Sequence, residues 1–394
     1  MRMAVVALLA FVVAFPAGPA LSAAEGPALS DAEGPALSDA EGAAVVSPAP
    51  KGDAEFRAGW LAFAEPAENP GADRSFDARQ QAKLTAIPHM EAAVAANPGN
   101  VDYQTGLAYV YLSAARYDKA KEAINKAIDK ERRDPLLYLL RGQAEAALVQ
   151  MSPEDVSKRA GPALTAFSRA AELDPKNALP LLQAASVAFD CDRSDDALAY
   201  LQKALARPEC RLYRLPLPDH LRPQPTEWLR TWQYIQLGQW YEIISRCQNV
   251  AHFLTRLGQE SEQAGNLGKA YECFRLARQV GGRIGTIQPH MFITMNTAID
   301  VLEDAYANLT RVAKATGNKD AQRWEGEAGI VRFGRQELYA ALQAYTEQLT
   351  KTPPPSPEEA LKVEAKYLGS IIAGIGLPLA PDVPSAPNAA RPAR

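Results

Sequence analysis

The stretch ALTAFSRAAELDP, residues 163–175, decides the fold. Phe167 follows Ala163 by four positions, Ala170 follows Phe167 by three, and Pro175 comes five positions later. Residues three and four apart share one face of a helix, where small alanines let a second helix approach closely. The large apolar residue fills the gap beside them, and the proline stops the helix. The stretch therefore predicts a helix packed tightly along one face.

The same spacing recurs along the chain at a regular interval. Ala86 and Ala120 lie 34 residues apart, as do Ala163 and Ala197. A fixed period of this length is typical of stacked helical hairpins. The other four occurrences are Ala86, Met90 and Ala93; Ala120, Ile124 and Ala127; Ala197, Leu201 and Ala204; and Ala270, Phe274 and Ala277.

This pattern resembles the tetratricopeptide repeat over residues 86–208 and 251–280. The first helix of each unit matches less strictly, although Gly142 and Gly258 take the glycine place of the family. The resemblance implies an all-α fold. It would be a right-handed α-solenoid of about five tetratricopeptide-like hairpins, closed by helical caps.

Composition divides the chain into seven parts. Acidic octapeptides with glycine and proline repeat before residue 42, and prolines crowd the C-terminal end, so neither region can bury enough surface to fold. The predicted parts are a signal peptide (1–24), an acidic disordered tether (25–52), repeats (53–208), a proline-rich connection (209–227), a long helix with a further repeat (228–285), capping helices (286–374) and a disordered tail (375–394).

The first 24 residues predict export. Arg2 precedes an apolar run from Ala4 to Phe15, and Ser22 and Ala24 are small residues at a cleavage position. The run is too short to span a bilayer, although a buried N-terminal helix is the alternative. We therefore expect a periplasmic or extracellular product without an integral membrane segment once the signal is removed.

The segment between the fourth and fifth repeats differs from the rest. Prolines between residues 208 and 225 prevent a regular helix, and a long helix then begins near Thr226. Its start carries Trp228, Trp232 and Trp240, which form either an aromatic core between the two halves of the stack or a ligand-facing patch.

Nothing in the sequence indicates catalysis, a metal or a cofactor. The four histidines have no metal-ligand spacing, and phosphate-binding and nucleophile motifs are missing. Gly281, Gly282 and Gly285 follow a predicted helix rather than a strand, which argues against a dinucleotide site. A net charge of −4 argues against nucleic acid as a partner.

Four cysteines in an exported chain raise the question of pairing. If one disulfide exists, we expect it between Cys210 and Cys247, which fall at the same end of consecutive helices. Cys191 and Cys273 would remain thiols. The alternative is four free thiols, because Cys247 also lies on the apolar stripe of its helix.

The resemblance also implies a binding surface. In this family the first helix of each unit lines a concave groove, and the positions that clamp a C-terminal carboxylate in some members hold different residue types here, among them Thr105, Gln143 and Leu182. A groove of mixed polarity suits an extended or helical peptide. Its matching positions are Asp102, Thr105, Tyr109, Leu112, Leu139, Gln143, Leu182, Ser186 and Phe189.

We therefore expect an exported scaffold that binds a protein or peptide and is not an enzyme. Two alternatives stay open at this point. One is an exported enzyme with an α/α helical core, and the other is an assembly factor of the cell envelope.

Overall fold

A computed structural model describes residues 51–68, 76–151, 156–216, 225–287 and 292–349. The predicted signal peptide, most of the tether, the C-terminal part of the caps and the tail lie outside these residues. The described helices are α2 Asp53–Glu68, α3 Phe76–Ala96, α4 Val101–Ser113, α5 Tyr117–Lys130, α6 Pro135–Gln150, α7 Val156–Leu173, α8 Leu179–Asp190, α9 Ser194–Leu205, α10 Pro225–Gln263, α11 Leu267–Ile287, α12 Phe292–Thr316 and α13 Ala321–Leu349.

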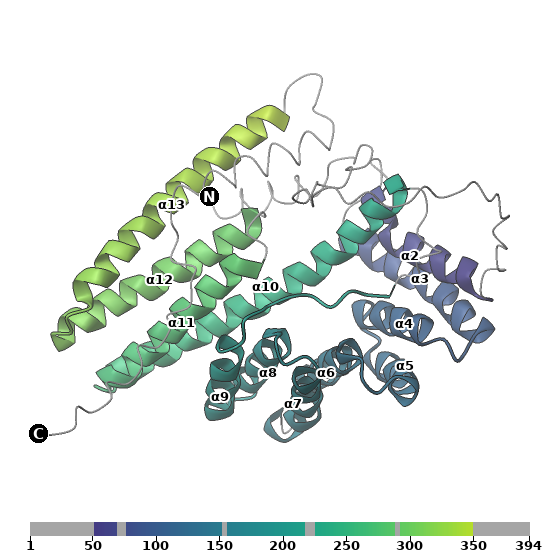
Figure 1. Cartoon of the computed structure of the whole chain (residues 1–394), viewed down its shortest axis with the longest axis horizontal. Coiled ribbons are helices and arrows are strands. Elements are labelled where there is room, and N and C mark those ends of the chain that lie inside the picture. Colours follow the sequence, from purple (N-terminus) through teal and green to yellow (C-terminus); the bar gives the residue numbers. More distant parts are fainter. Residues whose placement is uncertain (1–50, 69–75, 152–155, 217–224, 288–291, 350–394) are drawn as a thin grey trace, which may run out of the picture.

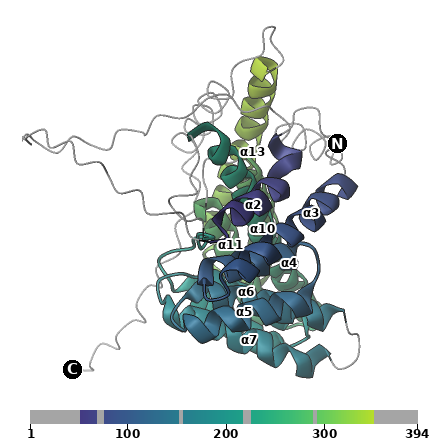
Figure 2. The ribbon, with the colours of Figure 1, turned by 90° about the vertical axis from the view of Figure 1, so that its right-hand side faces the viewer.

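The helices form a stack of hairpins, each helix packing mainly on its neighbours in sequence (Figure 1). Figure 2 views this stack from the end that carries α2 and α3. The only β contact among the described residues is an isolated parallel bridge between Asn177 and Glu209. The predicted all-α solenoid is confirmed.

The alanine spacing identifies the second helix of each hairpin. All fifteen residues of the five occurrences are fully buried, and they lie on α3, α5, α7, α9 and α11. In α7, for example, Ala163 and Ala170 flank Phe167 on the buried face. Close packing of this kind tolerates little change in side-chain volume.

Glycines mark the closest approach of the two helices of a hairpin. A Cβ atom added to Gly142 of α6 would lie 2.5 Å from the ring of Phe167 in α7. Likewise, a Cβ atom added to Gly258 of α10 would lie 2.5 Å from the ring of Phe274 in α11. Distances this short exclude any side chain, so both positions require glycine for space.

One turn geometry recurs in four hairpins. A residue with positive φ follows the first helix, and the next N–H donates to the carbonyl five residues earlier, which satisfies an otherwise unpaired helix end. The bonds are Arg116 to Tyr111 (2.8 Å), Arg193 to Ala188 (2.9 Å), Asn266 to Ser261 (2.8 Å) and Asn318 to Ala313 (2.9 Å). The last of these joins α12 to α13, which lack the repeat alanines yet share the hairpin turn.

The first hairpin, α2–α3, is held by aromatic packing. Phe56 and Trp60 of α2 are fully buried, and Phe56 lies 4.7 Å from the ring of Tyr103 in α4. Gly106 allows this approach, because a Cβ atom there would lie 2.5 Å from the Phe56 ring. The α2 helix therefore packs on the inner side of α4, which affects the groove directly.

Candidate functional site

The concave face of the stack is built by the first helices α4, α6 and α8. It carries all nine positions that the family resemblance assigns to a groove. The structure leaves Asp102 exposed and Tyr109, Leu112 and Gln143 half-buried. The other five are buried, namely Thr105, Leu139, Leu182, Ser186 and Phe189.

The protein's own chain covers the buried part of this face. The long helix α10 packs against α8 and α2. Phe253 of α10 stacks on Phe189, with ring centroids 5.3 Å apart and planes at 7°. Phe189 is thus covered by another helix of the same chain, and all five of these buried positions have little surface left for a partner. Four positions remain for a partner.

An extended segment, residues 206–216, reinforces this cover, and we call it the strap. It leaves α9 and runs back along the inner side of α8 and α6 (Figure 1). Tyr213 and Leu215 of the strap are buried, so it is part of the core rather than a loose loop. The sequence predicts a proline-rich connection here but not its path.

Asn177 precedes α8 and is fully buried. Its side chain binds the main chain of the strap. Its Nδ2 donates to the carbonyl of Arg211 at 2.9 Å, and its Oδ1 accepts from the Arg211 amide at 3.1 Å. The same Oδ1 accepts from the Leu179 amide at 3.1 Å and so begins the helix. One side chain therefore fixes both the start of α8 and the position of the strap.

Two arginines anchor the start of the strap. The Arg207 guanidinium donates to the carbonyls of Ala171, Asp174 and Asn177 at 2.9–3.0 Å, near the C-terminal end of α7. From α11, Arg283 donates to the Arg207 carbonyl at 2.6 Å. Cations are favourable at a helix C-terminus. The strap is therefore attached to α7 and α11 by charge-assisted bonds.

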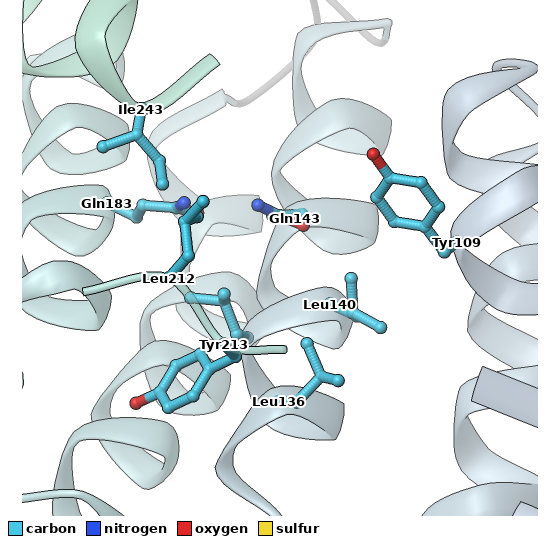
Figure 3. A pocket seen from close by; sticks show the side chains of 9 residues that line it. Tyr109, Leu136, Leu140, Gln143, Gln183, Leu212, Tyr213 and Ile243 are labelled. Carbon is cyan, nitrogen blue, oxygen red and sulfur yellow. The ribbon is translucent and has the colours of Figure 1, made fainter. Parts of the chain in front are cut away.

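A small pocket lies where the strap, three first helices and α10 meet. Tyr109 comes from α4, Gln143 from α6, Gln183 from α8 and Ile243 from α10 (Figure 3). Leucines of α6 and the strap residues Leu212 and Tyr213 complete the lining. The pocket therefore joins three positions of the predicted set, Tyr109, Leu139 and Gln143, with residues outside that set.

Two acidic side chains at the N-terminal ends of α4 and α6 have raised pKa values. Burial raises the pKa of Asp134, the N-cap of α6, whose Oδ1 accepts a hydrogen bond from the Leu136 amide at 2.8 Å. Burial also raises the pKa of Asp102 on α4.

Comparison with known proteins bears on this face. Residues 84–144 match a family described as tetratricopeptide repeat. The match supports membership of the tetratricopeptide repeat family. It covers the second part of α3, all of α4 and α5 and most of α6, and α4 and α6 carry the groove positions still open to a partner. Curated proteins give no match to the chain.

Metal-binding clusters and membrane-spanning helices are absent from the part of the chain that the structure describes. It holds no group of three or more His, Cys, Asp or Glu side chains arranged to bind a metal. None of its helices is both long and apolar enough to cross a bilayer. The side chains of Trp228, Trp232 and Trp240 lie outside the described residues.

The cysteines are free thiols in the structure, and the predicted pairing stays a prediction. Burial raises the pKa of Cys210 to about 12. Burial also raises the pKa of Cys247, and the nearby Cys210 raises it further. The two thiols therefore lie within electrostatic reach of each other, across the junction of the strap and α10.

Under mild oxidation we expect a single Cys210–Cys247 disulfide. Because burial raises the pKa of Cys210 to about 12, little of it is thiolate at pH 8, so formation should be slow and accelerate as pH rises. Peptide mapping without reduction tests this. Four free thiols after oxidation, or a bridge to Cys191 or Cys273, would contradict the pairing.

Proposed function

We propose that this protein is a scaffold that binds a segment of another protein on the uncovered part of its concave face. The observation that carries the proposal is the tetratricopeptide match at residues 84–144, because tetratricopeptide-like stacks present such faces to peptides. The uncovered positions Asp102, Tyr109, Leu112 and Gln143 combine aromatic, apolar and polar groups. A partner segment there would lie against α4 and α6.

The site is supported on rigid elements, as a binding surface requires. Tyr109 packs between Trp60 and Phe63 of α2, with ring centroids 5.9 and 5.8 Å away. Its ring is therefore held in place before a partner arrives, which reduces the entropy lost on binding. We expect Tyr109→Ala to weaken binding more than it weakens the fold.

Photo-crosslinking from position 109 tests the scaffold function. A benzophenone amino acid in place of Tyr109 should give one defined protein adduct in cells of the source organism. The same amino acid in place of Asp129, an exposed residue of the second helix α5, is the matched control. Identical adducts at both positions, or none at position 109, would refute binding on this face.

We also propose that the protein acts outside the cytoplasm. The support is the sequence of residues 1–24, which has the charge, apolar run and small residues of a secretory signal. Sequencing of the mature N-terminus should find Glu25 first. An intact N-terminus in a cytoplasmic fraction would exclude export and leave the binding proposal unaffected.

A further inference from the structure

We propose that the pocket between Tyr109, Gln143, Gln183 and Ile243 binds the side-chain carboxamide of an asparagine or glutamine in the partner segment. This assignment rests on the proposed function and adds the recognised group to it. The predicted groove set does not include Gln183, which lies between two of its positions, Leu182 and Ser186, on α8.

The proposal rests on the buried and unpaired side-chain amide of Gln183. Its side chain is only 1% exposed and lines the pocket, yet neither Nε2 nor Oε1 has a hydrogen-bond partner among the residues that the structure describes. Buried polar atoms are almost always paired, because an unpaired one loses its bonds to water without replacement. A ligand that pairs both atoms removes this penalty, which favours the bound state.

The ligand group must both donate and accept a hydrogen bond. A carboxamide does so in one planar unit and can meet the Gln183 amide with two bonds. The Gln143 side chain extends from α6 toward Gln183 across the same hollow and offers a second amide (Figure 3). Two amides facing one space suit a third amide between them.

Charge and size favour this group over other side chains. Among the residues that the structure describes, none that lines the pocket is charged, so a carboxylate would be desolvated without a cation to pair with it. The cavity volume is about 20 Å³, which admits the end of one side chain rather than a run of backbone. An aliphatic side chain would leave Gln183 unpaired.

The test selects peptides from a displayed random library on the full chain and measures their affinities. We expect the selected peptides to share one Asn or Gln, whose replacement by Leu or Asp lowers affinity at least tenfold. Gln183→Leu should lower affinity to the same extent while its melting temperature stays equal or rises. Gln202→Leu, an exposed position on α9, is the control that should leave affinity unchanged.

Three results would overturn the assignment. Selected peptides without a common carboxamide would do so, as would equal binding by Gln183→Leu. Leu-substituted peptides that bind as tightly as the parent peptides would show that the pocket holds an ordered water only. If the library yields no binder to the parent protein, the scaffold function itself fails, and the two failures are thereby distinguished. Should Gln183→Leu not fold, the peptide substitutions alone decide.

Discussion

Replacing Ala204 by arginine is expected to lower the free energy of unfolding by about 3 kcal/mol or more. Ala204 is fully buried on α9, at the third place of the alanine–apolar–alanine spacing. A long charged side chain there must push neighbouring helices apart or bury its charge unpaired. Ala170→Arg on α7 should have the same effect, and urea unfolding followed by circular dichroism measures both.

The same helix offers a matched control. Ala199 is exposed on α9, five residues before Ala204, so Ala199→Arg introduces the same side chain in the same helix without a packing conflict. We expect it to change stability by less than about 0.5 kcal/mol. If Ala204→Arg and Ala170→Arg both melt like the parent, the phasing of the repeat is wrong.

Asn177→Ala is expected to destabilise the protein by about 3 kcal/mol, because it leaves three main-chain groups without their partner in a buried place. These groups are the Leu179 amide and both the amide and the carbonyl of Arg211. The strap should then detach, and amide exchange at residues 209–215 should accelerate. Since Leu212 and Tyr213 line the pocket, peptide affinity should fall as well.

Asn266→Ala is the control for Asn177→Ala, because Asn266 caps a helix but does not anchor the strap. Asn266 caps α11 from an exposed position, where its Oδ1 accepts one bond from the Lys269 amide at 3.1 Å. Losing such a cap costs about 1 kcal/mol. Equal destabilisation by both variants, with slow exchange retained at residues 209–215, would show that Asn177 acts only as a cap.

The hairpins could be predicted because their signals are local. Ala163, Phe167 and Ala170 lie within two turns of one helix, so their spacing alone reveals the buried face. Gly142 and Gly258 hold the glycine place of the tetratricopeptide resemblance, and in the structure each lies against a phenylalanine of the same hairpin. Repeat architectures are dominated by such short-range contacts.

The strap and the covered groove could not be predicted, because they depend on contacts between distant residues. Asn177 meets Arg211 across 34 positions, and Phe189 of α8 meets Phe253 of α10 beyond α9 and the strap. No periodicity encodes such a path. Gln183 did leave a local signal, since it interrupts an apolar run from Ala178 to Ala185, and a lone amide in such a run marks a buried polar site.

Hydrogen–deuterium exchange of the full chain, alone and with the partner captured from position 109, tests the central claim most directly. Binding on the concave face predicts slower exchange in the C-terminal half of α4 around Tyr109, in the middle of α6 around Gln143, and at the strap residues 212–215. The exposed faces of α5 and α7 should exchange unchanged. Protection confined to α5, α7 or α13 would place the partner elsewhere and contradict the account.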